Sequence, residues 1–176
     1  VPVAMIGKDA FQESDIIGMA NPVVKYAFQP RTPGEIPGVV RKGFYIAETG
    51  RPGPVLIDIP KDVQQKEANM IFPDEFKIRG YHPWTDPDIV HVERAIEMLL
   101  SAERPIILAG GGTIISSAFA ELQSIAELLM IPVVTTFKGK GAFPENHPLS
   151  LGPIGMHGHA EANKMMTEAD CVLAIG

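Results

Sequence analysis

The sequence is poor in cysteine, in long apolar runs and in net positive charge. Its 176 residues include one cysteine, Cys171, which excludes an internal disulfide. The apolar neighbours of Cys171 predict a buried strand thiol in a reducing compartment, and we therefore expect a cytoplasmic protein. No run reaches the roughly 20 apolar residues of a membrane-spanning helix, and no signal peptide is visible at Val1.

The charge balance narrows the possible partners. The net charge of −6 argues against general binding to nucleic acid or to an acidic membrane surface. The composition, 45% hydrophobic and 20% charged, is that of an ordinary globular protein. The length allows one large domain or two smaller ones.

Several motifs of catalysis and metal binding are also missing. There is no nucleophile elbow, no Ser-His-Asp order, no Cys-His pair and no P-loop lysine. His147, His157 and His159 have no standard ligand spacing, and no cysteine or paired carboxylate supports them, so no metal site is predicted. The visible residues favour cofactor binding, without a complete catalytic set.

A short apolar run at 54–59 stands between proline and glycine residues and predicts a buried strand. Arg51 precedes it and Lys61 follows it. Two cations at opposite ends of a strand suit anionic ligands; the alternative is a central strand with two solvated basic residues. Before this strand we expect a helix at 13–20, an extended segment at 23–28 and a capped helix that begins at Thr32 and stops at Gly50. The apolar face of that helix is expected to be Ile36, Val39, Val40, Phe44 and Ala47.

Residues 60–87 show no period, and we interpret them as an interdomain linker anchored by Phe72, Tyr81 and Trp84. A helix capped at Thr85 should follow. We expect strands at 106–109, 131–136 and 171–175. A helix capped at Ser116 or Ser117, with an apolar stripe from Phe119 to Leu129, separates the first two strands. A long loop at 137–159 and a helix at 160–168 separate the last two, which gives a β-α-β-α-β pattern. This is half of a Rossmann-like parallel sheet with right-handed crossovers.

The triplet Gly110-Gly111-Gly112 lies between a strand and a helix. Glycines there allow a ligand to approach the backbone, and a helix N-terminus offers N–H groups to phosphate. The full G-x-G-x-x-G pattern is absent, so a tight turn remains the alternative. Thr136 and Phe137 are expected at the same crevice. His157 is expected to pack on a planar ring or to bond a ligand.

Five segments carry a resemblance to a known family: MIGKDAFQESDI, TGRPGPVLIDIPKDVQ, LAGGGT, PVVTTFKGKGAFPENHPLSLG and GMHGHAEAN. In order and nearly end to end, they resemble the catalytic large subunit of acetohydroxyacid synthase (acetolactate synthase), a thiamine-diphosphate-dependent enzyme. The resemblance implies that residues 1–60 end a pyrimidine-binding domain, 61–85 form a linker and 86–176 begin a central FAD-binding domain. Both ends of the chain then look cut, and we expect a fragment that is inactive alone.

The resemblance also implies an activity. The enzyme would decarboxylate pyruvate and condense the two-carbon unit with a second 2-oxoacid, pyruvate or 2-oxobutyrate, to give 2-acetolactate or 2-aceto-2-hydroxybutyrate for branched-chain amino-acid synthesis. The implied cofactors are FAD, thiamine diphosphate and Mg²⁺, the last two bound mainly outside this chain. The implied partners are a second copy in a homodimer or tetramer and a small regulatory subunit. The alternatives are a glyoxylate carboligase, a sulfoacetaldehyde acetyltransferase, a non-catalytic flavin or nucleotide module, or a purely structural domain.

Residue by residue, the resemblance implies one catalytic residue, Gln12, near thiamine and substrate. The implied substrate-channel residues are Pro2, Ala10, Phe11, Lys25 and Lys61. The implied FAD contacts are Arg51, Gly110, Gly111, Gly112, Thr136, Phe137, Gly155, Met156 and His157. The sequence departs from the family at three places: Lys8 replaces a usual Thr, Phe137-Lys138 a usual Leu-Met, and His159 a usual Thr.

Overall fold

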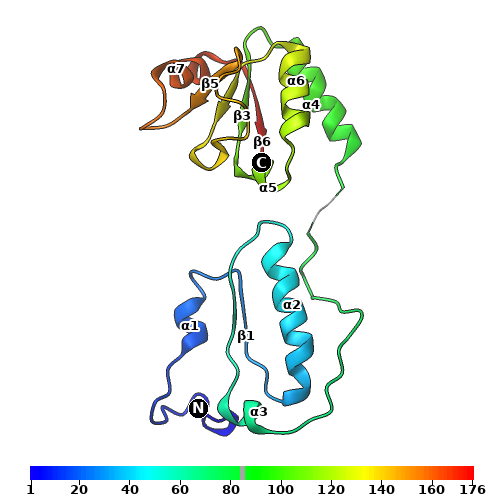
Figure 1. Ribbon diagram of the computed structural model, residues 1–176, viewed down its shortest axis with the longest axis vertical. Coiled ribbons are helices and arrows are strands. Elements are labelled where there is room, and N and C mark those ends of the chain that lie inside the picture. The colour runs from blue at the N-terminus through cyan, green and yellow to red at the C-terminus, as the bar shows by residue number, and fades with distance from the viewer. Residues whose placement is uncertain (84–85) are drawn as a thin grey trace. The chain divides into compact units, whose positions relative to one another are not determined.

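A computed structural model describes residues 1–83 and 86–176. The chain divides into two compact units, Val1–Asp86 and Pro87–Gly176, and each is described by itself (Figure 1). Both units are mixed α/β with parallel strands, which confirms the predicted fold class. The expected anchor Trp84 and the expected helix cap Thr85 lie outside the described residues.

The first unit is a β-α-β arrangement. Strands β1 (Tyr26–Phe28) and β2 (Val55–Ile57) pair in parallel, and α2 (Ile36–Glu48) connects them. The shorter elements are η1 (Val3–Met5), α1 (Ile16–Ala20), η2 (Pro33–Glu35) and α3 (Lys61–Gln65). Helix α3 was not expected, because five residues are too few to show a period.

The helix α2 differs from expectation at its start and on its buried face. The α-helix begins at Ile36, after a 3₁₀ turn in which the Glu35 carboxylate accepts hydrogen bonds from the Thr32 hydroxyl and the Arg31 amide. Its buried residues are Pro37, Gly43 and Ile46, whereas Phe44, expected inside, is 64% exposed. Gly43 explains the rotation, since a Cβ there would lie 3.1 Å from the Ile57 side chain of β2.

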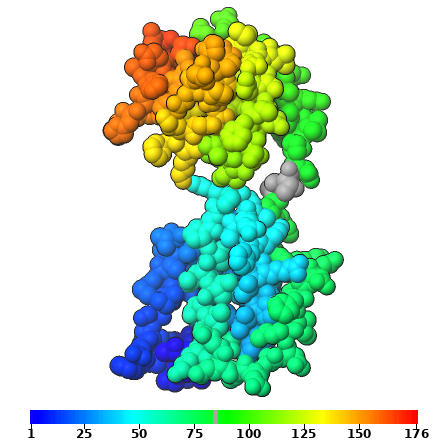
Figure 2. Space-filling view, viewed as in Figure 1, coloured from blue at the N-terminus to red at the C-terminus, as the bar shows by residue number. Residues whose placement is uncertain are grey.

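Residues 66–83, which we name the strap, run along α2 in the first unit (Figure 2). The Arg41 guanidinium donates to the Pro73 carbonyl and lies 5.8 Å from the Phe76 ring, which packs edge-on against Tyr45. The expectation that Phe72 anchors this segment is wrong, because Phe72 is 74% exposed. Phe76 and the expected Tyr81 hold the strap.

The second unit contains a four-stranded sheet of order β5-β4-β3-β6, and every neighbouring pair is parallel (Figure 1). Its strands are β3 (Pro105–Ala109), β4 (Val133–Thr135), β5 (Ser150–Pro153) and β6 (Cys171–Ile175). Strand β5 lies within the expected loop 137–159, so that prediction was wrong. Gly152 and Pro153 are typical of loops, so the sequence pattern did not indicate a strand here. Both residues are compatible with β5 because it is an edge strand.

Helices cover both faces of this sheet. Leu99 of α4 (Ile89–Ser101) and Leu122 and Ala126 of α6 (Phe119–Leu129) pack with Ile107 and Val133 on one face. On the other face, Ala162 of α7 (Ala160–Glu168) packs with Ile106 and Val134. The alternation of Ile106 and Ile107 follows from the two-residue period of a strand. The remaining elements are α5 (Gly111–Ile115) and η3 (Phe137–Gly139).

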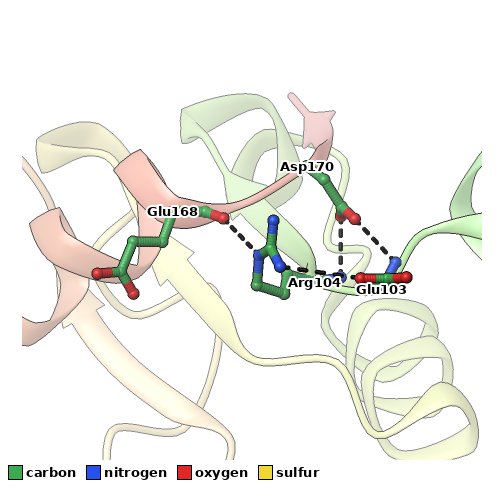
Figure 3. Close-up of polar contacts among 4 residues, drawn as sticks. All are labelled: Glu103, Arg104, Glu168 and Asp170. Atoms are coloured by element: carbon green, nitrogen blue, oxygen red, sulfur yellow. Dashed lines mark hydrogen bonds and ion pairs between the residues drawn. The ribbon is translucent and has the colours of Figure 1, made fainter.

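The start of β6 is fastened to the turn that precedes β3 (Figure 3). The Asp170 carboxylate accepts hydrogen bonds from the backbone amides of Glu103 and Arg104, both at 2.9 Å. The Arg104 side chain donates from Nε to the Glu168 carbonyl, also at 2.9 Å. These bonds fasten the start of β6 beside the start of β3, where Pro105 pairs with Cys171.

Candidate functional site

The carboxyl ends of the strands in the second unit gather most of the candidate cofactor residues. Because the four strands are parallel, the residues that follow them lie along one edge of the sheet. Gly110–Gly112 follow β3, Thr136 and Phe137 follow β4, and Gly155–His157 come shortly after β5. Strand β5 therefore brings residues 155–157 to the edge that the other candidates share.

The packing of the chain itself requires glycine at positions 110 and 112 and leaves little room for a side chain at Gly111. A Cβ on Gly110 would lie 2.0 Å from the Gly176 carbonyl oxygen, and one on Gly112 would lie 2.6 Å from the Gly176 Cα. A Cβ on Gly111 would lie 3.1 Å from the Lys138 Cβ. The tight-turn interpretation of the triplet thus has a direct structural basis, which does not depend on any ligand.

Thr136 is committed to local structure. Its hydroxyl accepts a hydrogen bond from the Gly139 amide at 3.0 Å, and its own amide donates to the Ala109 carbonyl at 3.0 Å. The following residue, Phe137, is 90% exposed. A fixed turn therefore holds an uncovered aromatic ring at the sheet edge.

The loop after β5 is held in a similar way. Asn163 of α7 exchanges two hydrogen bonds of 2.9 Å with the backbone of Gly155. Gly155 has a φ of 113°, which favours glycine, and Met156 beside it is 93% exposed. His157 is exposed as well. Asn163 was not assigned to the site from the sequence. It is the last residue of the GMHGHAEAN segment and lies in the predicted helix 160–168, which was a usable signal.

These residues fit a planar, largely apolar group such as a flavin. Phe137 and Met156 offer exposed apolar surface after the carboxyl ends of β4 and β5. Lys138, the residue that departs from the family, is exposed beside Phe137 and approaches Gly111 through its Cβ. Arg51, the remaining FAD candidate, belongs to the first unit, where it is exposed in the turn before β2.

A second candidate site lies at the carboxyl ends of β1 and β2. A cavity of about 210 Å³ there is lined by Val1, Ile6, Gln12, Glu13, Ser14, Ile16, Gln29, Asp58, Ile59 and Pro60. Gln29 directly follows β1 and Asp58 directly follows β2; the Gln29 amide nitrogen donates to the Asp58 carboxylate at 2.6 Å. Sequence reasoning did not assign Gln29 or Asp58 to a site, although their positions after two parallel strands are a usable signal.

The structure brings some of the candidate channel residues together. Val3 donates from its amide to the Asp62 carboxylate at 2.9 Å, which places Pro2 near Lys61. This contact lowers the pKa of Asp62, with a smaller contribution from the Lys66 ammonium at 3.1 Å. Lys61 is exposed in the first turn of α3.

The other channel candidates lie in two places. Ala10 is half-buried and Phe11 is 90% exposed, both in the loop that carries Gln12. Lys25 precedes β1, so it lies at the amino edge of the small sheet, opposite to Gln12 and Lys61. The structure therefore does not group Lys25 with the other channel candidates of this unit.

The described residues also bear on the requirements of a metal site and of a membrane-spanning helix. Within residues 1–83 and 86–176, no group of three or more His, Cys, Asp or Glu side chains is placed to hold a metal ion. Across the same part of the chain, the helices are too short or too polar to cross a membrane.

Comparison with known proteins identifies the class. The family profile described as "Thiamine pyrophosphate enzyme, central domain" matches residues 92–176, which lie within the second unit. The chain belongs to the thiamine pyrophosphate enzymes, and its second unit is their central domain.

The particular relatives are acetolactate synthase large subunits. A probable acetolactate synthase large subunit of Methanocaldococcus jannaschii is 50% identical over 179 residues and covers 100% of this chain. The acetolactate synthase large subunit of Buchnera aphidicola subsp. Acyrthosiphon pisum is 44% identical, and isozyme 3 of Escherichia coli is 40% identical, each across 100% of this chain. The chain spans about 30% of the length of these relatives.

Proposed function

We propose that this chain is part of an acetolactate synthase large subunit, a transferase that depends on thiamine diphosphate. One observation carries the proposal: relatives named for this activity match the full length of this chain with 40–50% identity. The proposed reaction decarboxylates pyruvate and joins the two-carbon unit to a second 2-oxoacid, giving 2-acetolactate or 2-aceto-2-hydroxybutyrate. Thiamine diphosphate, when bound, supplies the chemistry that cleaves and forms the carbon–carbon bonds.

The first unit contributes binding and orientation in this proposal. Gln12, exposed at the cavity with Gln29 and Asp58, presents a carboxamide that both donates and accepts hydrogen bonds. Such a group suits the carboxylate and carbonyl of a 2-oxoacid. The exposed ammonium of Lys61 attracts the anionic substrate by Coulomb interaction. Phe11, Ala10 and Pro2 supply apolar surface along the approach.

The second unit contributes a cofactor surface in this proposal. Phe137 and Met156 would hold the FAD ring system, and the turns at Gly110–Gly112 and Gly155–His157 would offer it backbone groups. Thr136 would orient the Phe137 turn, and the proposed FAD role of Arg51 in the first unit rests on the family resemblance alone. Since the reaction has no net redox change, FAD is proposed as a structural cofactor.

Mg²⁺, the oligomer and the compartment belong to the same proposal. Mg²⁺ and the diphosphate of thiamine are assigned to regions outside this chain. We propose a homodimer or tetramer with a small regulatory subunit, because the relatives are named large subunits. The half-buried thiol of Cys171, free in the structure, suits the reducing cytoplasm.

The test is a carboligation assay on the product of the complete reading frame that encodes this chain. Pyruvate, thiamine diphosphate, Mg²⁺ and FAD are supplied together and then each cofactor is withheld. We expect acetolactate formation that requires thiamine diphosphate and FAD. Product only from glyoxylate or sulfoacetaldehyde would replace the proposed activity by that of a related carboligase, and flavin binding without any product would indicate a non-catalytic module.

A further inference from the structure

The loop from Gly7 to Glu13 has an unusual backbone. Three of its residues have positive φ: Gly7 at 77°, Asp9 at 53° and Gln12 at 64°. Asp tolerates this region, but the left-handed conformation is uncommon for a longer side chain such as that of Gln12. A loop with this geometry requires interactions that hold it.

The Glu13 carboxylate supplies those interactions. It accepts hydrogen bonds from the backbone amides of Gly7, Lys8 at 3.2 Å and Ala10 at 2.9 Å. The Glu13 amide donates in turn to the Ala10 carbonyl at 2.8 Å. The amide of Ala10, followed by that of Gly7, lowers the pKa of Glu13, so the carboxylate is ionised at neutral pH.

These bonds join both ends of the loop to one side chain. Oε1 binds Gly7 at the start of the loop, and Oε2 binds Lys8 and Ala10 in its middle. Only Phe11 and Gln12 stand between Ala10 and Glu13. Phe11 is 90% exposed, and Gln12 lines the cavity of about 210 Å³ together with Gln29 and Asp58. Both residues line the cavity, but the carboxylate oxygens of Glu13 are bonded to backbone amides, and the described bonds leave the Gln12 carboxamide available to a ligand.

We infer that Glu13 is a positioning residue, which fixes the loop so that the Gln12 carboxamide is held at the cavity in its left-handed conformation. This inference rests on the proposed function, in which Gln12 acts on the substrate. Glu13 lines the same cavity, but both of its carboxylate oxygens are bonded to backbone amides, so we assign it the role of holding Gln12. Losing its three backbone bonds releases the loop and misplaces Gln12.

The experiment compares Glu13→Ala and Glu13→Gln in the complete protein. Hydrogen exchange of a peptide covering residues 7–13 measures how the loop is held, and acetolactate formation gives kcat and KM for pyruvate. Glu13→Gln keeps one acceptor oxygen and is expected to fall between the parent and Glu13→Ala. Asp15→Asn is the matched control, because the Asp15 carboxylate accepts from the Gly18 amide, outside the loop.

We expect faster exchange of residues 7–13 in Glu13→Ala, and a kcat lowered about tenfold or more with a smaller change in KM, because misplacing a group by about 1 Å can cost up to 10²-fold in rate. Asp15→Asn should leave both readouts close to those of the parent.

Unchanged exchange in Glu13→Ala would overturn the inference, whether or not kcat falls. Faster exchange with unchanged kcat would show that Gln12 needs no positioning. A parent protein without acetolactate synthase activity would overturn the proposed function instead, and with it the catalytic purpose of the loop.

Discussion

The ammonium group of Lys25 donates a hydrogen bond to the phenolic oxygen of Tyr81 at 2.9 Å, across 56 residues of sequence. The same ammonium also donates to the carbonyls of Ile46 and Thr49 at the end of α2. One lysine therefore caps a helix C-terminus and fastens the strap. Its proposed role at a substrate channel stays a prediction. That role would require the ammonium to act while it is hydrogen-bonded to Tyr81 and to the end of α2.

The first prediction concerns Tyr81. Tyr81→Phe keeps the ring that packs on Tyr45 with 5.9 Å between centroids, but it removes the hydroxyl that binds Lys25 and Thr49. Local opening of the strap should become at least about fivefold more frequent, since part-buried hydrogen bonds to Lys25 and Thr49 are lost. Limited proteolysis within residues 66–83 measures it. Phe72→Ala, at an exposed residue of the same segment, is the control, and equal cleavage of all three proteins would contradict the fastening role.

The second prediction separates packing from cofactor binding at the glycine triplet. Gly112→Ala places a Cβ 2.6 Å from the Gly176 Cα and should destabilise the cofactor-free protein by about 1–3 kcal/mol through overpacking. Gly34→Ala is the control, since a Cβ there meets nothing within 4 Å. Urea unfolding without FAD gives the comparison. Loss of FAD binding in Gly112→Ala with unchanged stability would show that the glycine serves the ligand alone.

The third prediction contrasts two phenylalanines of one loop. Phe143 is 2% exposed in the core, so Phe143→Ala should cost about 3–5 kcal/mol of unfolding free energy. Phe137 is 90% exposed, and Phe137→Ala should change stability by less than about 0.5 kcal/mol. In the proposed function the second variant instead retains less FAD after gel filtration. Full flavin content in Phe137→Ala would remove this ring from the cofactor surface.

The fourth prediction concerns substrate attraction by Lys61. Lys61→Ala should raise the KM for pyruvate roughly threefold and leave flavin content unchanged, because a lost surface charge weakens attraction of an anion. Lys61→Arg keeps the charge and should keep the KM. Lys66→Ala is the control at the opposite end of the same helix, where Lys66 pairs with Asp62 at 3.1 Å. Equal KM for parent and Lys61→Ala would end the steering role.

The fifth prediction follows from Asp170. Desolvation acts to raise the pKa of Asp170, but the backbone hydrogen bonds from Arg104 and Glu103 outweigh it and lower that pKa. A folded-state pKa below the unfolded value of about 3.9 gives stability that is present above that pH and is lost as pH falls through the folded pKa. Asp170→Asn should therefore lower the urea midpoint at pH 7, and the difference from the parent should shrink below about pH 4. A difference that does not change with pH would assign the effect to shape rather than charge.

Local patterns were sufficient for the longer and more regular elements. The helix at Ala160–Glu168 and the strand at Cys171–Ile175 are where the periodicity and the flanking residues placed them. The start of α2 was misjudged because a 3₁₀ turn precedes it, and β5 was missed because Gly152 and Pro153 resemble a loop. Short elements of this kind carry too few residues to show a period.

The sequence by itself determined the α/β class, the glycine turn after β3 and, through its motifs, the resemblance that the relatives confirm. Tertiary structure alone decided which distant residues meet: Lys25 with Tyr81, Gln29 with Asp58, and Asp170 with the amides of residues 103 and 104. The physical reason is the sequence separation over which each interaction acts. Propensity, capping and periodicity act over a few residues, whereas a hydrogen bond between segments tens of residues apart exists only after strand pairing and helix packing have placed both partners.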